Sequence, residues 1–552
     1  MVRCRFQLEK LTTSEKSTGP AVNTANPRKF GSRNNHATYL SSRARSRRLI
    51  SRHTRFPSRH ATMEFEARHT SSCWACEASA GPKHARVHTT HCPPQAGLRP
   101  SHGKLFGEEQ KERGASMPEV REVKSVCPHD CPDTCSMIAL VQDGRLLGVR
   151  GNPHHPTTRG YLCCKVHRYE ERVYSPDRVL YPYRRVGAKG EGKFERISWD
   201  EALDTIVTRW KEILARYGAE AILPYSYAGT MGVVQMSACD GRLWNRLGAT
   251  RLLRTICSTA AEAGYDYTLG WSGGIDPESF VYAKTIIVWG MNPASTCTHQ
   301  MAILRDAQKR GATLIVVDPF RTRTAECADW HVHLEHGTDS ALALGMMHVI
   351  FREGLQDQRF LEEYTVGWEA LRERVLNEYP PHRVAEITGI SPEEIERLAV
   401  TYATRRPSAI RLGYGIARNT NGGMMIRTIT CLPAVIGAWR ELGGGLLLST
   451  SAHFPLNMRA VKRPDLLQGN PRAVNMNQLG EALLTLNAPP IMALYVYNCN
   501  PAAVAPNSNR VIEGLLREDL FTVVHEQLWT DTARLADIVL PATTQMEHLD
   551  LH

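Results

Sequence analysis

The feature that most restricts the fold of this chain is a set of four cysteines between residues 127 and 163. They are Cys127, Cys131, Cys135 and Cys163. Three residues separate neighbouring members of the first three, and 27 residues precede the fourth. Four thiolates can hold a cubane iron–sulfur cluster. Pro128 and Pro132 disfavour helix between the first three cysteines, so we expect an irregular loop there.

A zinc ion is the alternative to a cluster for four cysteine ligands. Structural zinc sites usually use two pairs of ligands, with about two to four residues inside each pair. A triplet followed by one distant cysteine fits that pattern poorly. The clusters of radical enzymes use a similar triplet but leave one iron open, whereas here Cys163 supplies a fourth thiol. We therefore predict a 4Fe-4S cluster.

Two segments downstream of the triplet carry a family resemblance. They are Gly160-Tyr-Leu-Cys-Cys-Lys165 and Tyr174-Ser-Pro-Asp-Arg178. With the triplet, they resemble the N-terminus of the molybdopterin oxidoreductase family. The resemblance implies molybdenum or tungsten on two molybdopterin guanine dinucleotides. It also implies that Lys165 lies between cluster and pterin, where a cation would favour the reduced cluster and assist electron transfer.

The net charge of +11 is concentrated at the N-terminus. Residues 1–60 contain 14 Lys and Arg but 2 acids, which leaves −1 for residues 61–552. A nearly neutral globular part predicts no nucleic-acid partner. No apolar stretch of about 18 residues is present, so we expect no membrane span. The absence of a recognisable export signal favours a cytoplasmic location.

Residues 1–116 differ from the rest of the chain. They are rich in Arg, Ser, His, Thr and Pro and show neither helical nor strand periodicity. A transit peptide, a zinc site at Cys73 and Cys76, and a disordered or spurious extension are the alternatives. Of these we favour the last, because Met117 would be a natural start ten residues before Cys127.

A further cysteine is the expected ligand of the molybdenum or tungsten. In the family, a loop after a helix supplies Cys, selenocysteine, Ser or Asp to the metal. Cys257 occupies that place, and a thiolate suits a metal that changes oxidation state. A buried free cysteine is the structural alternative. The next residue is Ser258, whereas formate dehydrogenases have His there, which disfavours formate as substrate.

Residues 283–340 predict a nucleotide-binding βαβ unit. Two apolar segments, 285–289 and 313–318, predict parallel strands on either side of a helix over 294–310. The resemblance implies that the motifs after these strands contact one guanine dinucleotide, with Asp339 binding the guanine ring. The expected contact residues in this unit are Gly290, Asn292, Pro293, Asp318, Thr322, Gly337, Thr338 and Asp339.

A second unit resembles the first. Residues 491–497 predict a strand that enters an Asn-Pro pair at Asn500, as 285–289 enters Asn292-Pro293. Two such units match two dinucleotides. The resemblance also places a returning segment with Gly413 and Gly415 near the second pterin.

These patterns predict an α/β fold, with a small iron–sulfur domain followed by two Rossmann-like domains. The expected divisions are 117–182 for the cluster domain, 183–257 with 408–552 for one α/β domain, and 258–407 for the dinucleotide-binding domain. Family members continue into a C-terminal β-barrel domain that is absent here, so the sequence is interpreted as a C-terminally truncated catalytic subunit.

The resemblance implies an oxidoreductase. Cys257 and Lys165 are its candidate catalytic residues, and a partner protein or ferredoxin-like carrier exchanges electrons with the cluster. A cysteine ligand with Ser258 favours an oxo- or sulfur-transfer substrate. The alternatives are a formate dehydrogenase-like enzyme, a fragment that keeps only the cluster, and a zinc-binding interaction protein.

Overall fold

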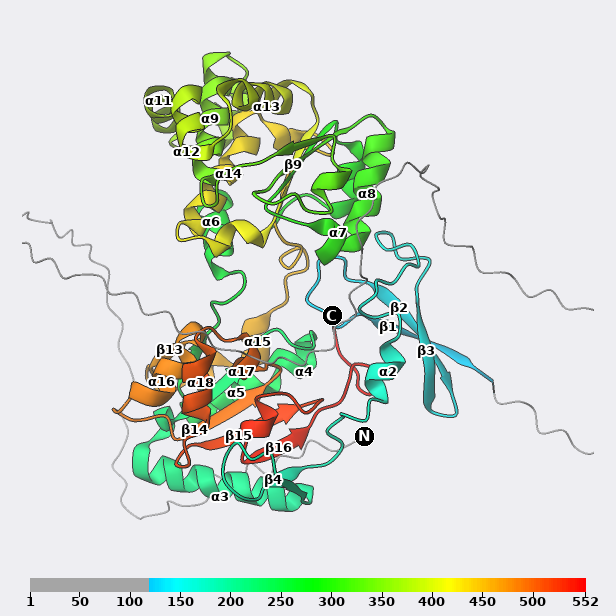
Figure 1. Cartoon of the computed structure of the whole chain (residues 1–552), viewed down its shortest axis with the longest axis vertical. Coiled ribbons are helices and arrows are strands. Elements are labelled where there is room, and N and C mark those ends of the chain that lie inside the picture. Colours follow the sequence, from blue (N-terminus) through cyan, green and yellow to red (C-terminus); the bar gives the residue numbers. More distant parts are fainter. Residues whose placement is uncertain (1–118) are drawn as a thin grey trace, which may run out of the picture. The chain divides into compact units, whose positions relative to one another are not determined.

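The computed structural model describes residues 119–552, and the predicted extension over 1–116 lies outside them. The described part begins with a three-stranded antiparallel sheet, drawn in blue and cyan in Figure 1. Its strands are β1 (Arg121–Val126), β2 (Ser136–Gln142) and β3 (Arg145–Gly151), in that order. Val126 pairs with Ser136, so the segment with the cysteine triplet is the connection between β1 and β2.

The first large sheet has six strands in the order β5-β4-β16-β15-β14-β6. The last four in this order are parallel to one another, and β4 and β5 add an antiparallel edge. The bounds are β4 (Tyr183–Arg185), β5 (Phe194–Arg196), β6 (Ile222–Ser226), β14 (Ala493–Tyr497), β15 (Phe521–Glu526) and β16 (Ile538–Pro541).

The second large sheet is entirely parallel and has five strands in the order β10-β9-β8-β11-β12. Numbered along the chain, this order is 3-2-1-4-5, the doubly wound arrangement in which ligands bind where the winding reverses, here beyond β8 and β11. The bounds are β8 (Thr285–Trp289), β9 (Thr313–Val317), β10 (Trp330–Val332), β11 (Ser408–Leu412) and β12 (Gly445–Leu447).

This sheet corrects one predicted boundary. Residues from 408 onward were assigned to the same domain as 183–257. Instead β11 pairs with β8 along its whole length and lies inside the five-stranded sheet, with β12 beyond it. The chain returns to the six-stranded sheet only at β14. Strand alternation along the sequence did not reveal this, because hydrogen-bond partners of parallel strands are distant in sequence.

Helices cover both faces of the five-stranded sheet and both faces of the six-stranded sheet. Alternate residues of β8 point to opposite sides: Ile286 and Val288 pack with α8, and Ile287 and Trp289 pack with α9 and α14. Figure 1 shows α7 and α8 on one side of this sheet and α9 with α11 to α14 on the other. All five residues of β8 are buried, and the four that follow Thr285 are apolar, as is typical of strands buried on both faces.

The helices beside the five-stranded sheet are α6 (Thr259–Leu269), α7 (Pro293–Thr296), α8 (Thr298–Lys309), α9 (Asp339–Arg352), α10 (Gln358–Tyr364), α11 (Trp368–Glu378), α12 (Pro381–Thr388), α13 (Pro392–Thr404) and α14 (Gly422–Val435). Those of the rest are α2 (Tyr169–Val173), α3 (Trp199–Tyr217), α4 (Val233–Ser237), α5 (Cys239–Leu247), α15 (Met458–Lys462), α16 (Leu479–Thr485), α17 (Pro501–Val504) and α18 (Ser508–Leu515). Two short strands, β7 (Arg251–Leu253) and β13 (Ala473–Asn475), pair in parallel.

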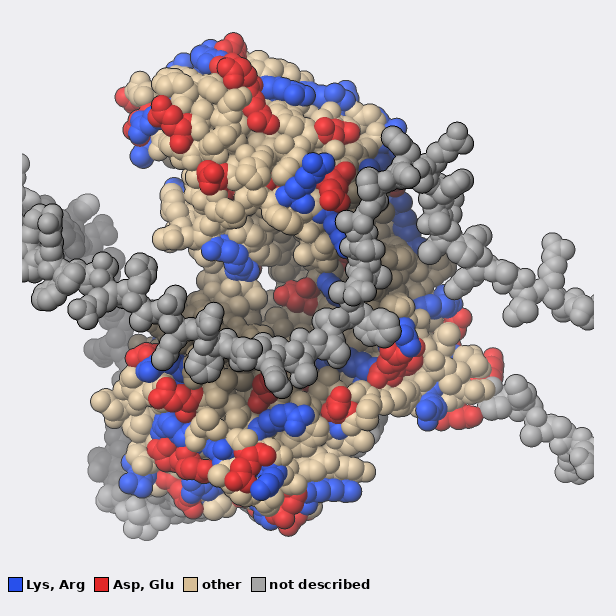
Figure 2. Space-filling model, in the orientation of Figure 1, with Lys and Arg blue, Asp and Glu red and all other residues tan. Residues whose placement is uncertain are grey.

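Within residues 119–552, no helix is long and apolar enough to cross a membrane. On the face drawn in Figure 2, basic and acidic side chains are interspersed, and neither sign forms a continuous area. This distribution agrees with the near-zero charge calculated for the chain after residue 60.

Candidate metal and cofactor site

The four predicted cluster ligands lie in two loops. Cys127 and Cys135 are 5% and 4% exposed, and Cys131 and Cys163 are partly exposed. The amide of Cys127 donates to the carbonyl of Cys135 at 2.9 Å, which closes the triplet into a compact loop. All four are free thiols.

Burial and mutual repulsion act on these thiols. Burial raises the pKa of Cys135, and the charges of Cys127, Asp133, Cys131 and Cys163 raise it further. Burial also raises the pKa of Cys131 to about 12, with Asp133 the next cause. Such effects arise only when groups lie close together, so the distant Cys163 has been brought to the triplet. A positive group among the four would stabilise their thiolates.

Among the described residues, no three His, Cys, Asp or Glu side chains gather around one point in a way that would hold a single metal ion. A cubane makes a different demand, because each of its four irons takes one thiolate. Lys165 is exposed beside the fourth cysteine, and its charge lowers the pKa of Cys127, although burial keeps that pKa above its ordinary value.

Cys257 lies just before α6, where the parallel strands of the six-stranded sheet end. Tyr227 follows β6, and burial followed by the Cys257 charge raises the pKa of its phenol. Cys499 follows β14; burial, then the charge of Glu526, raises the pKa of that thiol to about 12, and Cys257 adds to the rise. Arg418 donates to the carbonyl of Cys257 at 2.5 Å. The half-buried Cys257 thus lies among groups from three separate segments.

Three of the four predicted glycines, Gly290, Gly413 and Gly415, lie in contact with one another. Gly290 follows β8 with φ of 58°, and Gly413 follows β11. A Cβ on Gly413 would lie 2.2 Å from the Gly290 carbonyl oxygen, and one on Gly415 would lie 2.7 Å from it. The glycines are therefore required by the close approach of two chain turns to each other. That contact lies at the switch point of the doubly wound sheet.

Asn292 and Asn500 have matching surroundings. The Asn292 Oδ1 accepts from the hydroxyl of Thr324 at 2.7 Å, and the Asn500 Oδ1 accepts from that of Thr532 at 2.6 Å. Each hydroxyl also accepts from the amide two residues after its asparagine, at 3.1 Å and 3.0 Å. Pro293 begins α7, as its counterpart begins α17.

These asparagines therefore use their acceptor oxygens to hold their own turns. Cofactor contacts are predicted at Asn292 and Asn500, but the sequence patterns did not identify Thr324 and Thr532 as partners of their oxygens. A signal was present, since the threonine follows its asparagine by 32 residues in both units.

The remaining predicted contacts lie beyond β9 and at the start of α9. Asp339 is 6% exposed and accepts from the Trp289 indole at 2.7 Å. Burial raises the pKa of Asp339, and the charge of Asp318 raises it further, although the Trp289 bond opposes both. The pKa of Asp318 is also raised by burial. Two neighbouring carboxyl groups therefore lie at this edge.

The other three residues here have backbone roles. Thr322 is buried, and its hydroxyl accepts from the amide of Ala325 at 3.1 Å. Gly337 has φ of 77° in the turn before α9. Thr338 occupies the N-cap position, but its hydroxyl donates to the Glu335 carbonyl at 2.6 Å and does not cap the helix.

Comparison with known proteins identifies the fold family. The family model described as molybdopterin oxidoreductase matches residues 178–552, and the Fe4S4 domain model of the same family matches residues 120–175. The chain belongs to the molybdopterin oxidoreductase family. Its cofactors are accordingly a 4Fe-4S cluster and molybdopterin, as predicted.

Relatives of this chain include probable oxidoreductase YoaE of Bacillus subtilis, 50% identical over 430 residues, which are 78% of this chain and 63% of that protein. Dimethyl sulfoxide reductase DmsA of Escherichia coli is 28% identical over 491 residues, 77% of this chain and 59% of DmsA. The solved structure of acetylene hydratase from Pelobacter acetylenicus matches with a TM-score of 0.66 and 30% identity, over 76% of this chain and 63% of that one. The chain thus spans less than two thirds of the length of these relatives.

The surroundings of Arg411 show whether this chain could accommodate an anionic group. This arginine lies on β11, is 1% exposed, and donates only to backbone carbonyls, those of Leu412, Leu447 and Leu448. Its Nε has no partner, and no carboxylate pairs with it in the described part of the chain. Burial lowers its pKa, while the charges of Cys297, Tyr414, Asp133 and Cys131 oppose that. A buried cation without a carboxylate fits a site that receives an anion.

Proposed function

We propose that this chain is the catalytic subunit of an enzyme that moves electrons between a small substrate and a partner protein. The substrate reacts at a molybdenum or tungsten ion held by Cys257. A 4Fe-4S cluster on Cys127, Cys131, Cys135 and Cys163 exchanges electrons with an electron-carrying partner. The observation that best supports this is a direct contact between the cluster loop and α7: Sγ of Cys131 lies 3.6 Å from the carbonyl oxygen of Thr296.

That contact matters because α7 begins at Asn292-Pro293, the turn assigned to a dinucleotide. The cluster loop and this turn are thus separated by one short helix of four residues. Bound molybdopterin with its metal supplies the two-electron chemistry. The chain holds and orients it: Gly290, Gly413 and Gly415 bring two turns together at the switch point, and Asp339 offers its second carboxylate oxygen to a guanine ring.

The second dinucleotide is assigned to the turn at Asn500. Its support is the matching hydrogen-bond arrangement of Asn292 with Thr324 and of Asn500 with Thr532. Lys165 is proposed to lie between the cluster and one pterin. Its exposed position permits contact with a cofactor or a partner.

An oxo- or sulfur-transfer substrate is favoured. A cysteine ligand followed by Ser258 supports it, and so does the similarity to a dimethyl sulfoxide reductase. The second candidate is hydration of a small unsaturated molecule, which the matching structure of acetylene hydratase favours. Hydration has no net electron transfer, so a dye assay separates the two.

The test uses protein purified without oxygen. We expect about four iron and one molybdenum or tungsten per chain, and oxidation of a reduced dye by sulfoxides, N-oxides, nitrate or polysulfide. Formate with an oxidised dye and acetylene without a dye are the comparison substrates. Zinc in place of iron would contradict the proposed cluster. Iron without molybdenum or tungsten would show that the chain alone keeps only the cluster.

A further inference from the structure

A buried histidine of the dinucleotide-binding unit contacts both loops that carry the cluster cysteines. His299 is the second residue of α8, and it is 3% exposed. No sequence pattern marked it, because a single histidine near the start of a helix has no motif. What distinguishes it is the set of partners that the fold brings to its ring.

Each ring nitrogen of His299 has a partner from a different loop. Nδ1 lies 2.8 Å from Oδ2 of Asp133, and the His299 amide donates to the same oxygen at 3.1 Å. Nε2 lies 3.0 Å from the carbonyl oxygen of Tyr161. The Tyr161 ring also packs edge-on against the imidazole, with 5.2 Å between centroids. With a bond on each side, the ring is held in one orientation.

These partners lie in the two loops that carry the four proposed ligands. Asp133 lies between Cys131 and Cys135 in the triplet, and Tyr161 precedes Cys163 by two residues. The Nδ1 atom is also 3.8 Å from Sγ of Cys135. One side chain on α8 therefore joins the loop of three ligands to the loop of the fourth.

We propose that His299 is a positioning residue for the cluster, which fixes the two ligand loops to each other and to α8. This inference rests on the proposed cluster. Neither loop has regular secondary structure at its cysteines, so the backbone alone does not set the separation of the sulfurs. Bonds between ligand loops and a rigid helix supply that restraint, as outer partners do in metal sites. The Nδ1–H group, which donates to Asp133, also lies near Cys135, and the positive end of this dipole favours the reduced cluster.

Asp133 and His299 are both buried, so the Asp133 carboxylate requires hydrogen-bond partners within the protein. The Asp133 side chain is 4% exposed, and a buried carboxylate is costly unless it is hydrogen-bonded. Asp133 meets this requirement through the amide and the ring of His299. Loss of the ring therefore removes a loop contact and also leaves Asp133 with only the backbone amide as partner.

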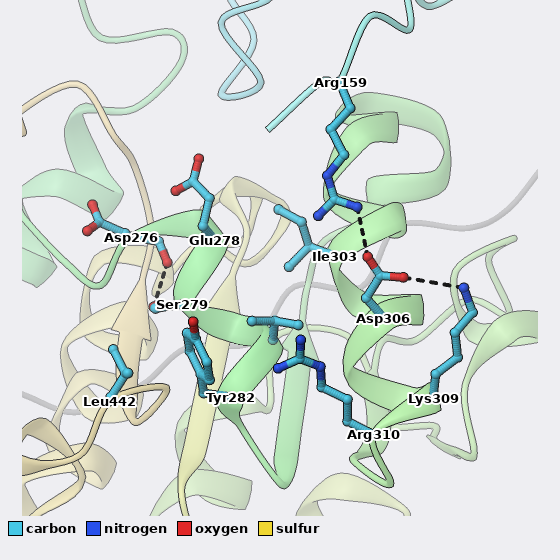
Figure 3. A pocket seen from close by; sticks show the side chains of 11 residues that line it. Arg159, Asp276, Glu278, Ser279, Tyr282, Ile303, Asp306, Lys309, Arg310 and Leu442 are labelled. Carbon is cyan, nitrogen blue, oxygen red and sulfur yellow. Dashed lines mark hydrogen bonds and ion pairs between the residues drawn. The ribbon is translucent and has the colours of Figure 1, made fainter. Parts of the chain in front are cut away.

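The same interface offers a matched control. Arg159 pairs with Asp306 of α8 at 2.9 Å, beside a surface hollow of about 550 Å³ (Figure 3). Arg159 lies two residues before Tyr161, on the loop that carries Cys163, but its side chain is 57% exposed. Exposed ion pairs contribute little, so Arg159→Gln removes an interface contact without disturbing the His299 arrangement.

The experiment compares the whole wild-type chain with His299→Phe, Asp133→Asn and Arg159→Gln. Iron per chain, the electron paramagnetic resonance spectrum of the reduced cluster and its midpoint potential are measured, with hydrogen exchange of residues 127–135 and 159–163. His299→Phe keeps a ring against Tyr161 but loses both bonds. We expect it to lose at least about half of its iron, to shift the potential downward in the remainder, and to exchange at least about tenfold faster in both loops.

Asp133→Asn keeps an acceptor oxygen for His299, so it should retain most of its iron, and Arg159→Gln should match wild type. If His299→Phe is insoluble, His299→Gln is measured in its place, since the amide keeps one bond. Full iron, an unchanged spectrum and unchanged exchange in the His299 variant would overturn the proposal. Wild-type protein without iron would instead overturn the cluster. Exchange is measured in cofactor-free protein too, so the two failures are distinguishable.

Discussion

The two Asn-Pro turns have the same backbone but different residues at their first position. Gly290 follows β8 with φ of 58°, and Asn498 follows β14 with φ of 53°. Both are left-handed, a conformation that glycine adopts freely and asparagine tolerates. An asparagine stands two residues later in each turn, with φ of −119° and −118°. The two turns therefore have equivalent backbone geometry.

The neighbours explain the different residues. A Cβ on Gly290 would lie 2.4 Å from Cγ1 of Ile416, so no larger residue fits there. The side chain of Asn498 has room, and its Nδ2 donates to the carbonyls of Tyr227 and Thr230, both at 3.1 Å. The turn at Gly290 packs against Ile416 of the same domain. The turn at Asn498 instead forms hydrogen bonds to the loop over residues 227–230, which lies beside Cys257. Equivalent backbones thus serve different roles according to what packs on them.

The largest expected effect is a difference in turnover between variants of two cysteines near the second turn, Cys257 and Cys499. Cys257→Ala should lower turnover of the loaded enzyme by at least about 100-fold, because the proposed metal ligand is lost, and should leave the iron content unchanged. Cys499→Ala, which removes a neighbouring thiol, should stay within about threefold. Steady-state rates and metal content check this. Equal losses in both variants would remove the special role of Cys257.

Exchanging Gly290 and Asn498 tests whether the packing around each turn determines which residue is accepted at its first position. Gly290→Asn should lower the free energy of unfolding by about 3 kcal/mol, because Ile416 is buried and cannot yield. The reciprocal Asn498→Gly should cost about 1–2 kcal/mol for its two hydrogen bonds. Urea denaturation measures both. Gly148→Ala, where a Cβ meets nothing within 4 Å, is the control. A harmless Gly290→Asn would refute the packing argument.

The shared threonine contacts predict a loss in each turn. Thr324→Val and Thr532→Val preserve shape but remove the hydroxyl that links an asparagine oxygen to a backbone amide, although the Asn500 oxygen keeps the Thr532 amide at 3.2 Å. Each should lower the free energy of unfolding by about 1–3 kcal/mol. Thr404→Val, at an exposed position at the end of α13, should change it by less than about 0.5 kcal/mol. A loss in one turn only, again by urea denaturation, would show that the two arrangements are not equivalent.

The smallest effect concerns an acid of the first unit. The folded state holds the proton of Asp339 more tightly, since burial raises its pKa above 3.8. Its contribution to stability is therefore fully present below that value and is lost as pH rises through the folded pKa. In cofactor-free protein, Asp339→Asn should gain about 1 kcal/mol at neutral pH and less in acid. Guanine dinucleotide content should fall in the same variant. A gain that is independent of pH would contradict the assignment.

Much of this chain could be predicted from sequence because its signals are local. The cysteine triplet, the apolar strand at 285–289 and its Asn-Pro turn each depend on residues a few positions apart. The mixed α/β fold and the cofactors follow from such segments, and the family model confirms them. The similarity between the Asn-Pro turn at Asn292 and the one at Asn500 was also evident from the sequence.

The tertiary structure alone decided which distant segments meet. Placement of β11 beside β8, the contact of Gly290 with Gly413, and the threonine that holds each asparagine all join residues far apart in the chain. His299 is the clearest example of such a long-range contact, because its partner Asp133 is 166 positions away in the sequence. No local sequence pattern at either residue predicts the other. Sequence determines local conformation through short-range sterics and hydrogen bonding. Pairing of parallel strands and burial of polar groups depend on the whole fold, because their partners are supplied by other segments.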